Sequence, residues 1–146
     1  MASVLTHVQN VWQAQRADSP IYALLLANVT IDDASMGAIR ASLQLDKNHT
    51  NSKGSLHGTM TACIIDWIAG MVIASYGLTG TGVSTDIHIS YLAGAKEGEV
   101  LEISGRSMKM GGTLAFVSAD ITKIKDGESV VVATGLHTKY VRQKCA

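Results

Sequence analysis

The segment from Leu56 to Tyr76 is the most apolar part of the chain, and Asp66 is its only charged residue. Its large apolar side chains fall on every side of a helical wheel rather than on one stripe. They are Met60, Ile64, Ile65, Trp67, Ile68, Met71, Val72 and Ile73. A helix that is apolar all round is a central, buried one. We therefore predict one long core helix that ends near Gly77, because glycine readily adopts the left-handed conformation of a C-terminal cap.

The residues after Gly82 alternate between apolar and polar side chains, as half-buried β-strands do. Four strands are predicted there, over residues 83–91, 100–110, 113–123 and 129–141. Turn residues separate them at Glu97-Gly98, Gly111-Gly112 and Asp126-Gly127. We expect these strands to form an antiparallel meander that curls around the long helix, which defines an α+β fold.

The first part of the chain adds a shorter helix and one strand. Apolar residues spaced three and four apart predict a helix over residues 4–17 that stops at Asp18-Ser19-Pro20. Alternation predicts a strand over residues 35–45, and the polar residues 46–55 indicate a loop. A length of 146 residues fits one domain, so we expect a single domain over residues 1–146 with its core over 35–141.

The composition excludes several functions. The 12 basic and 12 acidic side chains cancel, which argues against nucleic acid as a partner, because duplex binding depends on phosphate neutralisation. The longest apolar segment is interrupted by Asp66 and falls short of the roughly 20 residues that span a bilayer. Charged residues make up only 16% of the chain, so we expect another subunit to cover part of its surface.

The cysteines and the N-terminal segment bear on the compartment. Cys63 and Cys145 cannot build a disulfide framework and suit a reducing environment. We therefore expect a soluble cytoplasmic protein. Residues 4–17 contain one arginine and no acidic residue, which leaves a mitochondrial location open.

Asp66 is the strongest candidate for a catalytic residue. A carboxylate buried among isoleucine, tryptophan, methionine and valine side chains costs several kcal/mol unless it is paired or borders a wet cavity. A residue in such a position usually has a chemical function. The structural alternative is an aspartate on a less buried stripe of the helix.

His57 and Gly58 stand at the beginning of the same helix. Free backbone N–H groups at a helix N-terminus can hold an oxyanion, and a glycine lets the ligand come close, so Gly58 is the candidate donor. His57 is equally well explained as an N-terminal cap. Nine positions separate His57 from Asp66, which at ~100° per residue places them on opposite sides of the helix. If both act, a two-fold dimer would bring the helix start of one subunit to the aspartate of its neighbour.

Ser84 is predicted on the polar face of the strand over residues 83–91, together with Asp86, His88 and Ser90. Its surroundings do not match the G-x-S-x-G elbow of serine hydrolases, and the sequence places no histidine and acid for a triad. We expect Ser84 to be a hydrogen-bonding helper. Asp86 and His88 point the same way, but no third metal ligand is evident, so we expect no metal site.

Several motifs in a fixed order resemble the hotdog-fold acyl-CoA thioesterases. The matching residues are Asn51-Ser52-Lys53-Gly54-Ser55-Leu56-His57-Gly58, Asp66, Gly82-Val83-Ser84-Thr85-Asp86, Ser90-Tyr91, Lys109, Gly111, Thr113-Leu114-Ala115-Phe116, Gly135 and His137-Thr138-Lys139. Each motif alone is weak, but the ordered set is specific and covers residues 35–141. The resemblance implies a long helix wrapped by an antiparallel sheet, homodimers that join their sheets edge to edge, and dimers that pair into homotetramers. Its cross-subunit site agrees with the offset derived above from helix spacing.

The resemblance also implies a role for each candidate site residue. Asp66 is the general base or nucleophile, and Gly58 supplies the oxyanion N–H. Asn51 and His57 bind and polarise the thioester or position water, and Ser84 helps to orient that water. The resemblance implies no cofactor and no metal, since coenzyme A is part of the substrate.

Contacts to coenzyme A are expected from the C-terminal strands. The family often has a lysine where Gly112 stands and a proline where Gly94 stands, so the phosphate contacts fall to the remaining cations. The candidates for substrate or coenzyme A binding are Arg106, Lys109, Thr113, His137, Lys139 and Arg142.

We therefore expect an enzyme that hydrolyses an acyl-CoA thioester to a free acid and coenzyme A. Because the chain has only one phenylalanine, a medium or long fatty acyl chain is favoured over an aromatic group. Its tunnel should be lined by Ile64, Trp67, Ile68 and Met71. Two alternatives stay open. One is a hydratase or dehydratase of acyl thioesters on the same fold, and the other is a non-catalytic acyl-CoA binding module.

Overall fold

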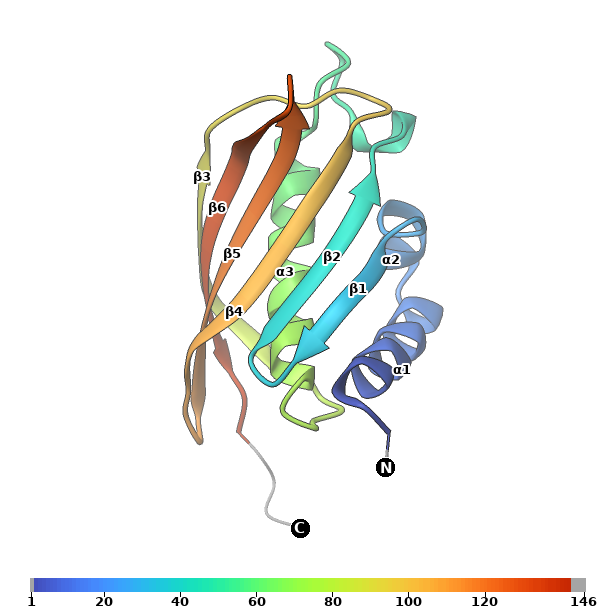
Figure 1. The fold of residues 1–146 in the computed structure, drawn as a ribbon. Helices are drawn as coiled ribbons and strands as arrows, with labels where there is room; N and C mark the ends of the chain where they lie inside the picture. Colours follow the sequence, from blue (N-terminus) through green and yellow to red (C-terminus); the bar gives the residue numbers. More distant parts are fainter. Residues whose placement is uncertain (1, 143–146) are drawn as a thin grey trace.

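One long helix, α3 (Gly58–Ala74), lies against one face of a curved six-stranded antiparallel sheet (Figure 1). The structure is a computed structural model that describes residues 2–142, so Cys145 lies outside the described residues. Across the sheet the strands are β1 (Thr30–Ser35), β2 (Ala38–Gln44), β4 (Val100–Met110), β5 (Leu114–Lys125), β6 (Glu128–Tyr140) and β3 (Val83–Tyr91). The expected architecture, a sheet wrapped around one helix, is confirmed.

The helix packs closely on the sheet because two strand residues beneath it are glycines. A Cβ on Gly105 in β4 would lie 2.8 Å from Cγ1 of Ile68, and one on Gly135 in β6 would lie 2.7 Å from Cγ2 of Ile65. Both isoleucines are fully buried. The missing side chains therefore make room for the branched residues of α3, which fill the space between helix and sheet.

One stripe of α3 is uncovered, contrary to the prediction of a helix buried on every side. Thr59 is exposed, and Ala62, Cys63 and Asp66 are half-buried. These positions recur every three or four residues, so they share one side of the helix. The predicted end is confirmed, since Gly77 has a φ of +87° and its N–H donates to the carbonyl of Ala74.

The sheet order corrects the prediction of a four-strand meander. The four C-terminal strands lie within two residues of their expected ends, but β3 pairs with β6 and not with β4. The chain crosses from the β3 edge to the middle of the sheet through residues 92–99 before β4 begins (Figure 1). Alternation predicts that a segment is a strand, yet it carries no information on which strand it joins.

Besides a short 3-10 helix described below, the N-terminal half contains one strand and one helix that the sequence pattern did not predict. The strand expected over residues 35–45 is β2. Residues 30–35 before it form β1, which was not predicted. Its acidic residues and the bulge after Ile31 obscure the alternation of apolar and polar side chains. The helix expected over residues 4–17 is α1 (Val4–Asp18), and Pro20 begins a second helix, α2 (Pro20–Leu25). Proline fits the first turn of a helix, where no N–H partner is needed.

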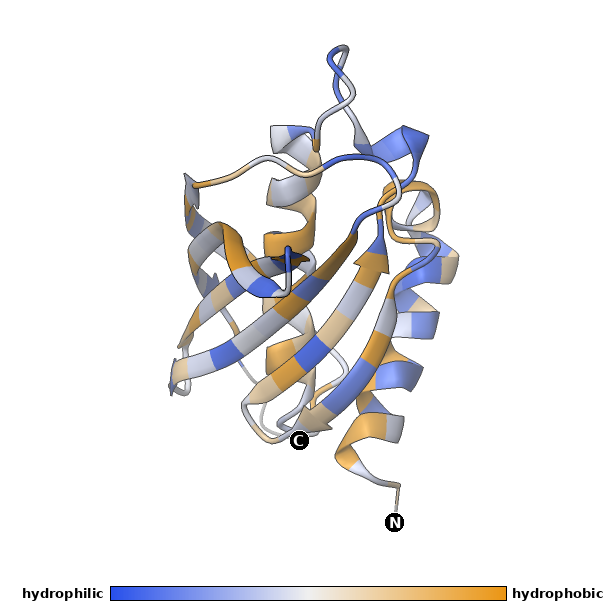
Figure 2. Ribbon diagram, turned by 45° about the horizontal axis from the view of Figure 1, so that its top comes forward, coloured by the Kyte–Doolittle hydropathy of each residue, from blue (hydrophilic) through white to orange (hydrophobic). Residues whose placement is uncertain are grey.

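Aromatic contacts attach these N-terminal helices to the core. The ring of Trp12 in α1 meets Trp67 in α3 and Tyr22 in α2 edge to face, with centroids 5.2 and 5.5 Å apart. The side of α1 that faces away from the sheet is hydrophilic (Figure 2).

A short 3-10 helix, η1 (Lys47–His49), lies in the predicted loop, and Nε2 of its buried His49 is 2.7 Å from the carbonyl of Leu25. None of the helices in residues 2–142 is long and apolar enough to cross a membrane.

Candidate active site

The side chain of Asp66 lines a cavity of about 590 Å³. The cavity lies between the N-terminal helices, the uncovered stripe of α3, and the neighbouring ends of β3 and β6. Its lining includes Gln15, Tyr22, Asp66, Thr81, Ser84 and Lys139. The side chain of Asp66 is 43% exposed in the single chain, so of the two arrangements expected for it, paired or at a wet cavity, it has the second, and it lies on the less buried stripe of α3. The carboxylate borders a cavity, where water or a substrate can reach it.

Ser84 and His137 meet beside this carboxylate. The Ser84 Oγ lies 2.7 Å from Nε2 of His137 and 3.5 Å from Oδ1 of Asp66, and that oxygen lies 3.9 Å from the same Nε2. The sequence pattern did not place a histidine and an acid near Ser84, whereas the fold does. A catalytic triad needs the acid on the opposite ring nitrogen from the serine. Here both groups approach Nε2, so the cluster is not a triad.

A β-bulge in β3 directs Ser84 into this cluster. The pairing of β3 with β6 shifts register between Ser84 and Asp86, so an extra residue, Thr85, separates them. Ser84 consequently lies on the helix side, while Asp86 and His88 line a separate cavity on the outer face of the sheet. The prediction that all three share one face is wrong for this reason. Within residues 2–142, no group of three histidine, cysteine or acidic side chains is gathered as metal ligands.

The local environment shifts the protonation of four groups around Asp66. Burial, and next the charge of Lys139, lowers the pKa of His137, and burial lowers the pKa of Lys139 against the opposing attraction of Asp66. Burial and the nearby Asp66 raise the pKa of Cys63 to about 11. The same two causes raise the pKa of Tyr22. The imidazole of His137 is therefore biased toward its neutral form, which can exchange protons with the Ser84 hydroxyl.

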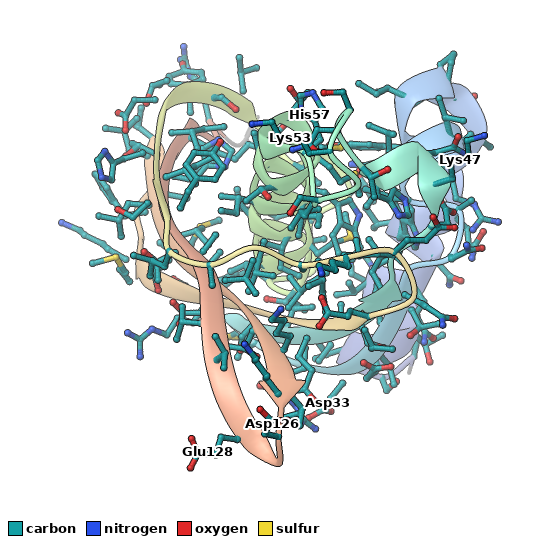
Figure 3. All side chains as sticks on the ribbon, turned by 90° about the horizontal axis from the view of Figure 1, so that it is seen from above. Asp33, Lys47, Lys53, His57, Asp126 and Glu128 are labelled. Atoms are coloured by element: carbon teal, nitrogen blue, oxygen red, sulfur yellow. The ribbon has the colours of Figure 1, made fainter. Side chains whose placement is uncertain are left out.

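The N-terminus of α3 forms the second part of the candidate site. His57 is the N-cap residue, and its Nδ1 accepts a hydrogen bond from the Thr59 N–H at 3.0 Å. Figure 3 looks down on this end of the helix, where His57 and Lys53 lie together. Among the described residues the Gly58 N–H makes no hydrogen bond, as is usual in a first helical turn. It is available to a carbonyl oxygen.

Asn51 organises the loop that leads into α3. Its Oδ1 accepts hydrogen bonds from the N–H groups of Lys53 and Ser55, at 2.9 and 3.1 Å. The Nδ2 donor of Asn51 makes no hydrogen bond within residues 2–142 and remains available to a ligand. Tyr91 was missed as a site residue, yet its hydroxyl donates to the carbonyl of Gly58 at 3.1 Å and its ring lies against that glycine. It stands at the end of β3, and the sequence offered it only as part of the Ser90-Tyr91 motif.

The two parts of the site are well separated within one chain. Gly58 and Asp66 are eight residues apart, which is about 12 Å along a helix that rises 1.5 Å per residue. Half-turn spacing also places His57 and Asp66 on different sides of α3. A small thioester carbonyl cannot contact the Gly58 N–H and the Asp66 carboxylate of the same chain.

The expected coenzyme A contacts divide into exposed and buried residues. Arg106, Lys109, Thr113 and Arg142 are exposed, whereas His137 and Lys139 are buried beside Asp66. The side chains proposed to line the acyl tunnel are buried in the hydrophobic core of the single chain, and none of them lines the cavity beside Asp66. These side chains are Ile64, Trp67, Ile68 and Met71.

A sheet wrapped around a helix, with a carboxylate at mid-helix and free N–H groups at the helix start, defines the class of hotdog-fold enzymes. The sequence pattern of the thioesterase superfamily matches residues 53–130. The chain belongs to the thioesterase superfamily, and it is a thioester hydrolase.

Named relatives and solved structures agree with this assignment. Human acyl-coenzyme A thioesterase 13 is 36% identical over 117 residues, which cover 80% of this chain and 82% of that protein. The crystal structure of zebrafish thioesterase superfamily member 2 has a TM-score of 0.83 and 35% identity, and the match covers 96% and 99% of the two chains. A hypothetical thioesterase protein from Streptococcus pneumoniae, solved with coenzyme A, has a TM-score of 0.71 and 28% identity over 80% and 92% of the chains.

Proposed function

We propose that the chain hydrolyses medium- or long-chain fatty acyl-CoA to a free fatty acid and coenzyme A, in a site shared between two subunits. Asp66 of one subunit activates the attacking water, and the Gly58 N–H of the other holds the carbonyl oxygen. The names of relatives support the acyl-CoA substrate, since human acyl-coenzyme A thioesterase 13 shares 36% identity. The Streptococcus pneumoniae neighbour was solved with coenzyme A.

The observation that carries the shared site is the placement of the two half-sites at opposite ends of β3. Ser84 near the start of β3 contacts Asp66, and Tyr91 at its end contacts Gly58. When two copies of a strand pair antiparallel about a two-fold axis, the start of one lies beside the end of the other. Pairing of β3 with its counterpart in a second copy therefore brings Gly58 of each subunit toward Asp66 of its partner.

The exposed edge of β3 supports such pairing. β3 is the last strand of the sheet, and beyond β6 it has no second neighbour in the described part of the chain. A nine-residue edge strand with open N–H and carbonyl groups readily pairs with another chain. Its apolar side chains Val83, Ile87 and Tyr91 are exposed in the single chain, and a second copy would cover them. We further propose that such dimers pair into homotetramers.

The chemistry follows from these positions. As water attacks the thioester carbonyl, negative charge gathers on its oxygen and the Gly58 N–H stabilises it. Loss of such a donor typically costs about 10²–10³ in rate. Asp66 accepts the proton of the attacking water, with Ser84 orienting that water, and the C–S bond breaks to release the coenzyme A thiolate, which takes up a proton. Alternatively, Asp66 attacks the carbonyl directly, expels the thiolate and forms an anhydride that water then hydrolyses. In a single-turnover reaction in oxygen-18 water, label in the Asp66 carboxylate would establish the anhydride route, because the general-base route puts label only into the fatty acid.

Release of free thiol from short, long and aromatic acyl-CoA substrates tests the proposal, with Asp66→Asn measured beside the unaltered protein. We expect turnover of medium and long fatty acyl-CoA and a loss of at least about 10²-fold in the variant. Unchanged turnover in Asp66→Asn would remove Asp66 from the mechanism. Hydration of enoyl-CoA by the same samples would instead favour the hydratase alternative, and binding without any turnover would favour the acyl-CoA binding module.

A further inference from the structure

Lys139 has a largely buried side chain that lines the cavity, and its ammonium group has no polar partner within residues 2–142. It lies near the end of β6, directly across from Ser84 in the pairing of β3 with β6, and only 5% of its surface is exposed. Its ammonium group makes no hydrogen bond and no close ion pair with any residue of the described range. It lines the same cavity as Asp66 and Ser84. An exposed phosphate contact does not require such burial.

A lysine rarely stays buried without compensation, because removal of the ammonium from water is costly. The opposite charge that acts on Lys139 is the carboxylate of Asp66, which opposes the effect of burial on its pKa. Lys139 and Asp66 thus line one cavity, and no hydrogen bond or close ion pair joins them. That cavity is the one in which the thioester is proposed to react.

We propose that Lys139 is a positioning residue that keeps Asp66 ionised as the water-activating base while the cavity is filled with an acyl chain. This inference rests on the proposed function. When an apolar acyl group displaces water from around the carboxylate, the charged form loses solvation. A fixed positive charge in the same cavity offsets that loss and keeps the carboxylate able to accept a proton.

Other titratable groups also face this carboxylate. Tyr22 approaches from α2, Cys63 lies on α3 one turn earlier, and His137 lies on β6. Asp18 from α1 also lines the cavity, and Ser84 contacts Asp66 from β3. Tyr22, Cys63 and a neutral His137 carry no charge near pH 7, and Asp18 adds a second negative charge. Lys139 is therefore the cation among the cavity-lining residues that can balance Asp66.

The kinetic test is the pH profile of kcat/KM for Lys139→Met, which keeps the length of the side chain and removes its charge. We expect the acidic limb to move upward by about one pH unit, because the carboxylate then protonates more easily. The ratio of kcat/KM between alkaline and acidic pH should rise accordingly. Lys139→Arg, which keeps the charge, should return the limb toward its original position. An unchanged limb in Lys139→Met would overturn the inference, whatever the absolute rate.

Two further measurements separate this inference from the proposed function. Lys123→Met is the matched control, since Lys123 pairs with Glu99 at 3.2 Å outside the cavity, and its pH profile should not move. NMR titration of ¹³C-labelled lysine methylene groups needs no turnover. In Asp66→Asn the Lys139 signal should titrate at lower pH than in the unaltered protein, and an identical titration would refute the coupling. Failure of acyl-CoA hydrolysis would refute the proposed function alone.

Discussion

The hydroxyl of Ser84 and the imidazole of His137 lie 2.7 Å apart on neighbouring strands, and the carboxylate of Asp66 approaches the same edge of the imidazole. This contact depends on the bulge in β3, which moves Ser84 from the outer face of the sheet to the helix side. The hydroxyl can therefore exchange a hydrogen bond with either neighbour. This position agrees with the proposed role of Ser84, which is to orient a water molecule beside Asp66.

Ser84→Ala tests this placement. We expect kcat to fall about 10-fold to 100-fold with little change in KM, because the hydroxyl orients water and does not bind the acyl group. The matched control is Ser118→Ala on β5, where the hydroxyl contacts Arg106 on the outer face. Steady-state thioester hydrolysis checks both variants. An equal loss in the two would show that Ser84 has no special role.

Gly58→Ala tests the oxyanion site without disturbing the fold. A Cβ at this position would lie 3.5 Å from the Tyr91 ring, an ordinary contact, and alanine is well accepted in a helix. The added methyl group would stand where the thioester has to approach the N–H. We expect thermal stability to be retained and kcat/KM to fall by about 10²-fold. Gly80→Ala, with open space around its Cβ, is the control and should keep its activity.

Subunit mixing tests whether the site is shared. Gly58→Ala and Asp66→Asn are each expected to have little activity as separate proteins. When the two are unfolded together and refolded, half of the dimers are mixed, and each mixed dimer contains one site with both residues intact. About a quarter of the original activity should return if two-fold pairing assembles the site. Activity that stays at the level of the separate variants would place each site within a single chain.

Gly135→Ala tests the close approach of helix and sheet. Its Cβ would lie 2.7 Å from Ile65, which is buried and cannot move aside. We expect the free energy of unfolding to fall by about 1–3 kcal/mol, as overpacking does in well-filled cores. Urea denaturation measures the change. Gly112→Ala serves as the control, since nothing lies near its Cβ and stability should change little.

The buried imidazole of His137 predicts acid sensitivity. Its pKa is lowered below the ordinary value of 6.5, so the unfolded chain binds a proton more readily than the folded chain. The free energy of unfolding should therefore decrease as pH falls through 6.5 toward the lower folded value. His137→Gln should flatten that part of the curve, measured by denaturation at several pH values. An unchanged curve would mean that His137 does not contribute to acid sensitivity.

The sequence pattern predicts the helix and the C-terminal strands because periodicity records which side of an element is buried. Gly58 and Asp66 were placed on this basis, since a helix start and a lone carboxylate are both visible in the chain. The argument from burial of Asp66 overstated its cost, because the uncovered stripe of α3 also contains Ala62 and Cys63, whose side chains do not mark it as exposed in the sequence. The fact that Asp66 is the only charged residue in its apolar segment was a more reliable reason to single it out than the argument from burial.

The contacts made across strands were not predictable in the same way. Ser84 meets His137 only because β3 joins β6, and neither strand encodes its neighbour in its alternation. The bulge at Thr85 also reverses the face that simple counting assigns to Ser84. Lys139 appears in the sequence as one of several strand cations, and only the packing of α1, α2 and α3 reveals that it is enclosed.

The crossing of residues 92–99 from the edge of the sheet to its middle has a consequence for biosynthesis. β3 is made before β4 and β5, yet its partner β6 is the last of the described strands to be synthesised. Until then β3 lacks its neighbour in the sheet, and its backbone N–H and carbonyl groups stay unpaired during translation. The sheet can therefore close only when β6 has been synthesised. Synthesis of the final residues of β6 is thus the step that commits the nascent chain to its native topology.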